Sequence, residues 1–400
     1  MSMIKRKLTE LFLHGAVGLA TFLSVLSLGM IFFFVIKEGS GLLSFDLIRG
    51  NYHARNYVAV FEQPDLNQEY EFPNLSGDVY LSFRYGIALE QSQDLAGDSV
   101  IKVAYVAPSS PFAHMINQDY TKSPLSLDED WVLSRITYEN HPSSLTSRGA
   151  SMMIQDLEEA DRVVFEVMFA QEGGGIFGSL MTTLYLIFLT LIVALPFGIF
   201  SAIYFNEFAK NSGITKVMRS FIETLTGVPS IIFGLLGITV FVPLTMRFTP
   251  ANGSNLIAGA LTLSVILLPV IIRTTEEALK VVPDDHRFAS LALGANKTQT
   301  TFKIVLPQAI PGILTATFLG IGRIIGESAA LIFVLGAAIK DSVRVFEPST
   351  SLAVHIWSMM TDEPANVALS STIALIILLI VFVLNLSIKF VVSRFVQRRS

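Results

Sequence analysis

Six long apolar segments constrain this chain more than any other feature of its sequence. Each is close to the ~20 apolar residues that a helix needs to cross a bilayer. They lie at residues 11–36, 176–205, 220–246, 256–275, 310–338 and 366–391. Apolar residues make up 52% of the 400 residues and charged residues only 15%, which is too apolar a composition for a water-soluble domain of this length. The sequence therefore predicts an all-α polytopic membrane protein with six transmembrane helices.

The first apolar segment follows Lys5, Arg6 and Lys7 and is itself followed by Lys37. Its 26 residues exceed the apolar core of about 7–15 residues found in cleaved signal peptides. We therefore predict a retained transmembrane helix within residues 1–36, with its N-terminus in the cytoplasm. A cleaved signal peptide is the alternative.

Lysine and arginine in the short connections predict the orientation of the spans, because these residues accumulate on the cytoplasmic side. With the N-terminus inside, the short outside connections carry only Arg247, Lys340 and Arg344. The inside connections and the C-terminal tail carry Lys210, Lys216, Arg219, Lys280, Arg287, Lys297, Lys303, Arg394, Arg398 and Arg399. This distribution predicts a multi-pass protein of the cytoplasmic (inner) membrane with both termini cytoplasmic and residues 37–172 extracytoplasmic.

Residues 37–172 have the composition of a separate domain. Their formal net charge is −12, which leaves +7 for the rest of the chain. Segments 56–64, 77–91, 99–108 and 161–171 are rich in Val, Tyr and Phe and partly alternate, a pattern typical of strands. Residues 143–160 are expected to form one helix. We predict an inserted mixed α/β, β-rich domain that serves as a spacer or docking collar, with ligand sensing as the alternative.

The chain lacks the motifs of an enzyme that works alone. It contains no cysteine and no G-x-x-x-x-G-K-[ST] phosphate-binding loop. His53, His114 and His141 are scattered without the spacing of a metal site, so we expect them to be surface residues. We predict no catalytic residue, no metal and no cofactor in this chain, and no nucleic-acid partner.

The inside connection 276–308 is amphipathic and basic. Within it, "RFASLAL" at 287–293 can form a short helix that ends at Gly294, a residue suited to a helix C-terminus. A second helix is expected to run from there to Pro307. A helix–glycine–helix element of this kind can insert into a groove on a soluble partner. The alternative is a helix that lies on anionic lipid.

This connection resembles the cytoplasmic loop of binding-protein-dependent ABC importers of the MetI-like type, whose pattern is EAA-x3-G-x9-I-x-L-P. Phe288 replaces the leading glutamate of that pattern. The matching positions, with the preceding Arg287, are Phe288, Ala289, Ser290, Gly294, Ile304, Leu306 and Pro307. In the family this loop is the coupling helix that docks on the ATPase subunit, and the resemblance implies that role for these residues.

Four further segments resemble phosphate ABC transporter permeases of the PstA type. They are "GVPSIIFGLLG" at 227–237, "LPVIIRTTEEALKVVP" at 268–283, "ASLALGA" at 289–295 and "GIGRIIGESAALIF" at 320–333. The resemblance spans about 173–392 and does not cover residues 37–172. It implies that 173–400 form a MetI-like permease core with five transmembrane helices, in a complex that imports inorganic phosphate. The implied partners are a homologous second permease, two copies of an ATPase that binds ATP and Mg²⁺, and an extracytoplasmic phosphate-binding protein.

Arg323 and Glu327 stand four residues apart in an otherwise apolar segment. On one helix they would share a face, deep in the membrane, where each unpaired charge is costly. The guanidinium group suits phosphate oxygens, and a nearby carboxylate that competes for it would favour release. We therefore predict that Arg323, Glu327 and Ser328 line the substrate pathway. A purely structural ion pair that fixes the helix register is the alternative.

Two further positions complete the predicted site. Arg273 and Thr274 lie near the inner end of the fourth span, where Arg273 is either a second pathway residue or a positive-inside anchor. Gly227 and Pro229 interrupt the third span and predict a hinge, with a static kink as the alternative. Two other functions stay open: a permease for sulfate, molybdate or phosphonate, and a membrane receptor that senses through residues 37–172.

Overall fold

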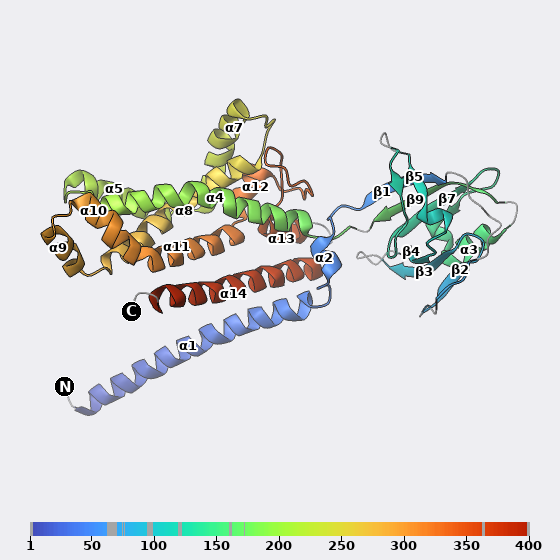
Figure 1. The fold of residues 1–400 in the computed structure, drawn as a ribbon. Coiled ribbons are helices and arrows are strands. Elements are labelled where there is room, and N and C mark those ends of the chain that lie inside the picture. The colour runs from blue at the N-terminus through green and yellow to red at the C-terminus, as the bar shows by residue number, and fades with distance from the viewer. Residues whose placement is uncertain are drawn as a thin grey trace. The chain divides into compact units, whose positions relative to one another are not determined.

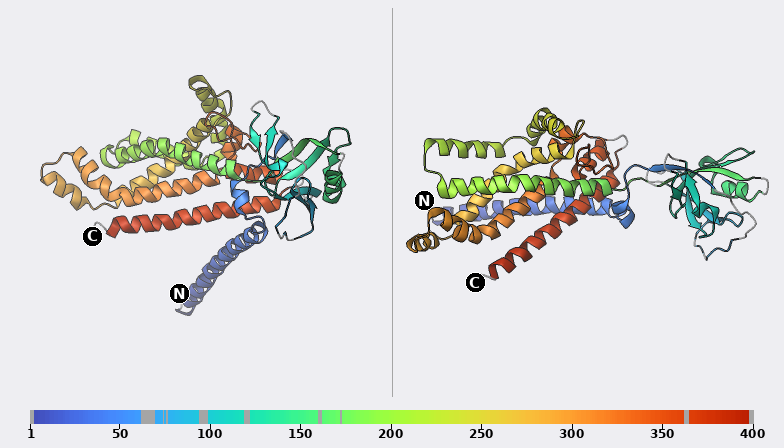
Figure 2. Two further views of the ribbon diagram at one scale, coloured as in Figure 1. Left: turned by 45° about the vertical axis from the view of Figure 1, so that its right-hand side comes forward. Right: turned by 45° about the horizontal axis from the view of Figure 1, so that its top comes forward.

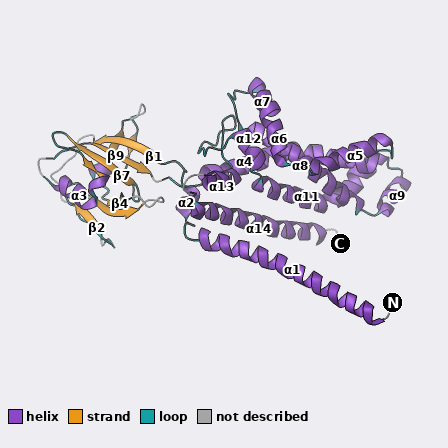
Figure 3. Ribbon diagram, turned by 180° about the vertical axis from the view of Figure 1, so that it is seen from behind, coloured by secondary structure: helices purple, strands orange, loops and turns teal. Residues whose placement is uncertain are grey.

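The computed structural model describes residues 3–61, 70–73, 75, 77–93, 99–118, 122–159, 162–171, 173–361 and 365–397. The chain divides into two compact units (Figure 1). The helical unit comprises Met1–Ile48 and Ile176–Ser400, and the β unit comprises Arg49–Gly175. Figure 3 shows that strands are confined to the β unit.

Among its described residues, the helical unit contains six helical segments long and apolar enough to cross a membrane, which confirms the predicted number of spans. These segments are Leu11–Gly39, Phe177–Phe208, Ser230–Phe248, Leu256–Lys280, Lys297–Gly326 and Val367–Phe390. The individual helices are α1 (Met3–Gly39), α2 (Phe45–Arg49), α4 (Phe177–Ile203), α5 (Gly213–Thr226), α6 (Ser230–Leu236), α7 (Val242–Phe248), α8 (Leu256–Lys280), α9 (Asp284–Ala292), α10 (Lys297–Thr300), α11 (Leu306–Gly326), α12 (Ala329–Leu335), α13 (Leu352–Thr361) and α14 (Val367–Gln397). Helices α4, α6 and α10 each continue directly into a π-helical turn, and these turns are Tyr204–Phe208, Gly237–Phe241 and Thr301–Val305.

Two predicted spans are bounded differently in the structure. The segment predicted at 220–246 is broken at Gly227–Pro229, so that α5 and α6 are separate helices; proline disfavours helical backbone in the residue before it. Both bounds predicted for the segment 310–338 were wrong. Its helical run already begins at Lys297, passes through Pro307 without a stop, and ends at Gly326.

The interior of the helical unit lies where α4, α8 and α11 pack together, with Leu186, Leu267 and Ile324 among its buried residues. Small residues allow close approach, as where Gly234 of α6 meets the backbone of Ala330 in α12. The long helix α1 packs against α14, and the Thr372 hydroxyl donates a hydrogen bond to the Gly39 carbonyl at 2.9 Å. Both termini and α9 lie toward one end of this unit (Figure 1, Figure 2).

The β unit is built on one antiparallel sheet with strand order β2-β3-β4-β7-β9-β1-β5-β6, and β8 pairs with β7. Its central pairing sets Tyr57 of β1 opposite Phe169 of β9, and Leu133 of β7 opposite the same Phe169. The strands are β1 (Arg55–Phe61), β2 (Val79–Ser82), β3 (Ile87–Gln93), β4 (Ser99–Val106), β5 (Met115–Asn117), β6 (Pro124–Leu125), β7 (Val132–Tyr138), β8 (Ser144–Leu145) and β9 (Val164–Gln171).

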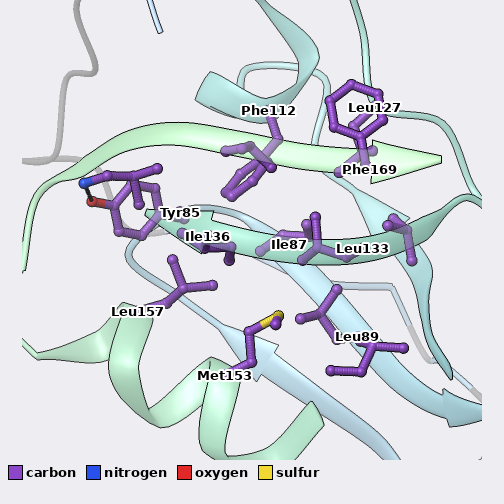
Figure 4. Close-up of a cluster of buried hydrophobic side chains, with 14 of the residues drawn as sticks. Tyr85, Ile87, Leu89, Phe112, Leu127, Leu133, Ile136, Met153, Leu157 and Phe169 are labelled. Atoms are coloured by element: carbon purple, nitrogen blue, oxygen red, sulfur yellow. Dashed lines mark hydrogen bonds between the residues drawn. The ribbon is translucent and has the colours of Figure 1, made fainter. Parts of the chain in front are cut away.

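A single apolar cluster fills the β unit (Figure 4). Alternate residues point into it, such as Ile101 and Val103 of β4, because successive strand side chains face opposite ways. Helix α3 (Ala150–Glu158) covers the cluster with Met153 and Leu157. The prediction of a β-rich region is thereby confirmed.

The local predictions for the β unit were incomplete. Residues 143–160 do not form one helix: β8 and a 3₁₀ turn (Thr146–Arg148) precede α3, which begins only after Gly149. Strands β5 to β8 were not predicted: β5, β6 and β8 have only two or three residues each, and the alternation of β7 is interrupted. Residues 62–64 and 161 of two predicted strands, residue 160 of the predicted helix, and Arg398 and Arg399 lie outside the described residues.

Candidate functional site

The cytoplasmic element predicted from the sequence has the expected helix–glycine–helix form. Helix α9 ends at Gly294, whose φ of +89° is a conformation that glycine adopts without strain. The N–H groups of Gly294 and Ala295 donate to the carbonyls of Leu291 and Ser290 at 3.0 and 3.2 Å, which closes the helix in a Schellman motif. Asn296 and Gln299 then form a capping box at the start of α10.

Arg287 turns toward the protein interior and not toward solvent. Only 15% of its side chain is exposed. It donates to the carbonyl oxygens of Val282 and Leu279 at 2.6 and 2.9 Å and to Glu207 Oε1 at 2.8 Å. Asp284 accepts a further bond at 3.2 Å. Arg287, which was expected at the ATPase surface, therefore holds α9 in place from the interior.

Other coupling residues divide between the surface and the interior. Phe288 is 65% exposed and Leu293 is 90% exposed, so α9 presents apolar side chains outward. Ala289 is exposed, whereas Ser290 is half-buried and bonds the Thr300 hydroxyl of α10 at 2.9 Å. The remaining predicted coupling residues lie on the following helix and are half-buried, and they are Ile304, Leu306 and Pro307.

Arg323 and Glu327 do not share a helix face, and this part of the prediction was wrong. Helix α11 ends at Gly326, and Glu327 has extended backbone angles (φ −81°, ψ 116°). Its carboxylate accepts a hydrogen bond from the Ala330 N–H at 3.2 Å and so caps α12. Among the described residues, no ion pair joins Glu327 to Arg323.

The break also changes the position of Arg323 along its span. Arg323 lies in the last turn of α11, ~25 Å beyond Leu306 at ~1.5 Å per residue, near the end of the continuous helical segment Lys297–Gly326. Its side chain is exposed, and Ser328 beside Glu327 is half-buried. The sequence predicts one continuous helix here. The structure instead has a short non-helical stretch between α11 and α12, and the Arg323 guanidinium group lies next to it.

Arg273 lies in a different place from Arg323. It is 70% exposed and lies 3.4 Å from Glu277 on the same face of α8. Together they line a cavity of about 220 Å³ between α5 and α8. The lining residues are Arg219, Ile222, Glu223, Thr226, Pro269, Ile272, Arg273, Glu276, Glu277 and Lys280.

Thr274 and Thr275 differ in their surroundings. The Thr274 hydroxyl donates to the Val270 carbonyl at 2.7 Å, so it is occupied by its own helix. Thr275 is fully buried, and its hydroxyl has no hydrogen-bond partner within the described part of the chain. Neither residue lines the cavity beside Arg273.

Two ion-paired residues in this region were missed from the sequence. Glu207 lies in the last turn of the second spanning segment, Phe177–Phe208, and pairs with Arg287, and Glu276 of α8 accepts a hydrogen bond from Arg219 of α5 at 2.7 Å. The only sequence signal was a carboxylate at the inner end of an apolar segment, with a basic connection elsewhere to pair with it. Nothing local identifies which arginine, because 80 residues separate Glu207 from Arg287.

The chain belongs to the family described as binding-protein-dependent transport system inner membrane component, whose model matches residues 194–400. It is therefore a multi-pass permease of the MetI-like class. Its similar relatives include the "Probable ABC transporter permease protein YqgI" of Bacillus subtilis, 35% identical over 232 residues, with 54% of this chain and 77% of the relative covered.

Two other relatives carry a more specific name. The "Phosphate transport system permease protein PstA 1" of Mycobacterium tuberculosis is 33% identical over 233 residues, with 57% of this chain and 74% of the relative covered. The "Phosphate transport system permease protein PstA" of Yersinia pestis is 32% identical over 225 residues, covering 56% and 74%. A solved structure of the MetNI methionine ABC transporter covers 55% of this chain and 94% of its own, at 22% identity and a TM-score of 0.44.

Proposed function

We propose that this chain is a permease subunit through which an ATP-driven importer moves inorganic phosphate across the cytoplasmic membrane. Relatives of the same family that are named phosphate transport permeases cover more than half of the chain. The observation that carries the substrate assignment is the broken span, in which the exposed Arg323 stands beside the non-helical residues 327–328. Discontinuous spanning helices are typical of substrate sites in transporters.

Arg323 is the residue that would contact the ion. A planar guanidinium binds phosphate oxygens in a forked geometry, and transport requires a site weak enough to release its ion. Glu327 is committed to the start of α12 and so limits how much positive charge accumulates there. We place Ser328 beside this contact, and Arg273 and Thr274 farther along the path toward the cytoplasm.

The orientation in the membrane follows from the ends of the helical unit. Both termini and α9 lie toward one end (Figure 3), and six spans return the chain to its starting side. The basic residues Arg287, Lys297 and Lys303 gather there, which the positive-inside tendency assigns to the cytoplasm. The β unit then belongs outside the cytoplasm, because its two connections leave from the far ends of α1 and α4.

The outward apolar side chains of α9 define how ATP hydrolysis would reach this chain. We assign Phe288 and Leu293 to the contact with a cytoplasmic ATPase, two copies of which would bind ATP and Mg²⁺. A homologous second permease would complete the path, and an extracytoplasmic phosphate-binding protein would deliver the ion. This chain would itself perform no bond chemistry.

The test is uptake of labelled phosphate by vesicles that contain the complete complex, normalised to the amount of assembled complex. Arg323→Gln should lower uptake about tenfold or more, the factor for one lost hydrogen bond to a charged group. Arg323→Lys should retain part of the uptake, because it keeps the charge and loses the fork. Arg247→Gln, at an exposed arginine in the last turn of α7, is the matched control and should transport normally.

The variant Arg323→Gln with Glu327→Gln separates a pathway role from a structural one. Near-normal uptake by this double variant would show that Arg323 is not in the pathway. Competition by sulfate, molybdate and a phosphonate tests the substrate. A parent complex that takes up one of these and not phosphate would overturn the assignment to phosphate.

A further inference from the structure

The π-helical turn Tyr204–Phe208, at the end of α4, is contacted by cations from three other elements. π-helical turns are rare and occur mostly as single turns, frequently at functional sites. This one ends the second spanning segment. Its sequence, YFNEF, contains the carboxylate of Glu207, of which 8% is exposed.

The first contact comes from α9. Arg287 donates to Glu207 Oε1 at 2.8 Å, while Asn206 Nδ2 donates to the same oxygen at 2.9 Å. Arg287 also donates to the carbonyls of Leu279 and Val282 at the end of α8. One guanidinium group therefore joins the ends of α4 and α8 to the start of α9.

The second contact comes from α5. Arg219 donates to the Phe205 carbonyl at 2.7 Å, and its guanidinium carbon lies 5.4 Å from the centre of the Phe205 ring. A second nitrogen of the same guanidinium group, Nη1, donates to Glu276 Oε2 of α8 at 2.7 Å. The third contact comes from α10, where Lys297 Nζ lies 5.5 Å from the centre of the Phe208 ring.

These contacts share an electrostatic and a packing cause. The C-terminus of a helix carries partial negative charge and favours cations, and α4 ends at this turn. Phe205 is also buried in one cluster with Ile203, Leu279, Val282 and Val305, so the turn is packed as well as bonded. Figure 1 shows α5, α9 and α10 gathered at the same end of the helical unit.

The turn matters for how a displacement of α9 reaches the spanning helices. Helix α9 continues into α8 and α11 through short connections, so a displacement of α9 reaches those spans directly. No short connection of the chain joins α9 to α4. The Glu207–Arg287 pair and the shared cluster supply that link.

We infer that the π-helical turn Tyr204–Phe208 is the joint that transmits displacement of α9 to α4, and that Glu207 and Arg287 are the positioning residues of this joint. The inference rests on the proposed function, in which a partner ATPase moves α9. Arg219 and Lys297 hold the same turn from α5 and α10. The pair fixes the angle of α9, so that closure of the ATPase displaces α4 together with α8 and α11.

The measurement is the number of phosphate ions transported per ATP hydrolysed by the assembled complex. Glu207→Gln keeps the shape of the side chain and removes its charge. It should assemble and hydrolyse ATP while the ratio falls about tenfold, as for one lost hydrogen bond to a charged group. Arg287→Lys, which keeps the charge and loses the fork, should give an intermediate ratio.

Glu347→Gln is the matched control. Glu347 pairs with Arg344 at 3.0 Å in another part of the helical unit, and its loss should leave the ratio unchanged. A purely structural role for Glu207 would reduce the amount of assembled complex and leave the ratio of the remaining complex intact. That result would overturn the inference.

Two further measurements keep the outcome decisive. If Glu207→Gln does not assemble, Glu207→Asp replaces it, because this variant moves the carboxylate one methylene farther from Arg287. An unchanged ratio of phosphate transported to ATP hydrolysed in that variant would contradict the inference. Because the chain has no cysteine, spin labels on Phe200→Cys and Asp285→Cys, both at exposed positions, can report the distance between α4 and α9. ATP should change that distance in the parent and change it less in Glu207→Gln; equal changes would also overturn the inference. A parent complex without phosphate uptake would refute the proposed function instead.

Discussion

The two units of this molecule distribute apolar side chains in opposite ways. In the β unit the largest fully buried side chains are aromatic, with Tyr85, Phe112 and Phe169 inside one cluster. In the helical unit large apolar side chains cover the outside, as Phe197 and Phe382 do. The interior of that unit holds many hydroxyl groups. Its fully buried threonines include Thr182, Thr190, Thr262, Thr275, Thr350 and Thr372.

This difference follows from the solvent that each unit faces. Water drives large apolar surfaces inward, and the buried aromatic cluster of the β unit has the form that this force produces. Lipid supplies no such force, so spanning helices associate through close packing of small residues and through hydrogen bonds. Ser179 of α4 illustrates the second case: its buried hydroxyl lies 2.8 Å from the buried His355 Nδ1 of α13.

The largest expected effect comes from truncating a buried aromatic residue in the β unit. Phe112 is fully buried and packs edge-on against Phe61 at 5.1 Å and Tyr85 at 6.0 Å. Phe112→Ala should lower the free energy of unfolding of the β unit by about 3–5 kcal/mol. Chemical unfolding is followed by the fluorescence of Trp131, in a Trp357→Phe background that leaves one tryptophan.

The same truncation on the outside of the helical unit tests the contrast. Phe382 is 60% exposed in α14, and Phe382→Ala should change the stability of the detergent-solubilised protein by less than about 0.5 kcal/mol. Circular dichroism of the helices during heating measures it. Equal losses for the two variants would show that an outward aromatic side chain stabilises the helical unit as much as a buried one stabilises the β unit, and the comparison would fail.

The next largest effect comes from the opposite substitution in the helical unit. A Cβ at Gly234 would lie 2.9 Å from the Ala330 backbone, so α6 and α12 would have to separate. Gly234→Leu should cost about 1–3 kcal/mol by overpacking, measured as a lower unfolding temperature in detergent. Gly29→Leu in α1, where a Cβ meets nothing within 4 Å, is the control. If both glycine variants unfolded at the temperature of the unchanged chain, close packing at Gly234 would not support this unit.

The contrast between the units also explains which features the sequence predicts. Spans are predicted well because apolar length is a property of one segment and needs no partner. Gly294 was predicted as a helix end for the same reason, since its cause is local. In the β unit the alternation of β4 was visible, whereas β7 was missed because bulges at Leu133–Arg135 and Thr137–Tyr138 interrupt its alternation.

The candidate site was harder to predict because its geometry depends on contacts distant in the sequence. The break after Gly326 is stabilised by the hydrogen bond that the Glu327 carboxylate accepts from the Ala330 N–H. The surrounding run of apolar and small residues gave no sign of this break. The pairing of Glu207 with Arg287 joins residues 80 positions apart. Sequence identified the chemical types in the site, and the structure shows which of them meet.

The last expected effect appears only at high pH and concerns a buried polar group in the β unit, where polar interiors are the exception. Tyr138 is 3% exposed, and its hydroxyl lies 3.1 Å from the Ser144 hydroxyl. Burial, opposed by the hydrogen bond with Ser144 and assisted by the nearby Asp156 carboxylate, raises the pKa of Tyr138 to about 12. In the unfolded chain a tyrosine loses its proton near its ordinary pKa of about 10.

This difference makes the β unit less stable at high pH. Between about pH 10 and 12 the unfolded chain has released a proton that the folded unit still holds, so the stability present below pH 10 is lost as the pH rises. The part of the slope due to Tyr138 should reach at most about 1.4 kcal/mol per pH unit, read from urea midpoints of Trp131 fluorescence at pH 8, 10 and 11. Tyr138→Phe should flatten it, leaving the part due to Tyr85, whose pKa burial also raises. Tyr80→Phe, at an exposed position of β2, should retain the slope of the unchanged chain. If Tyr138→Phe and Tyr80→Phe gave the same slope, the buried hydroxyl of Tyr138 would not be the group that sets the alkaline limit of this unit.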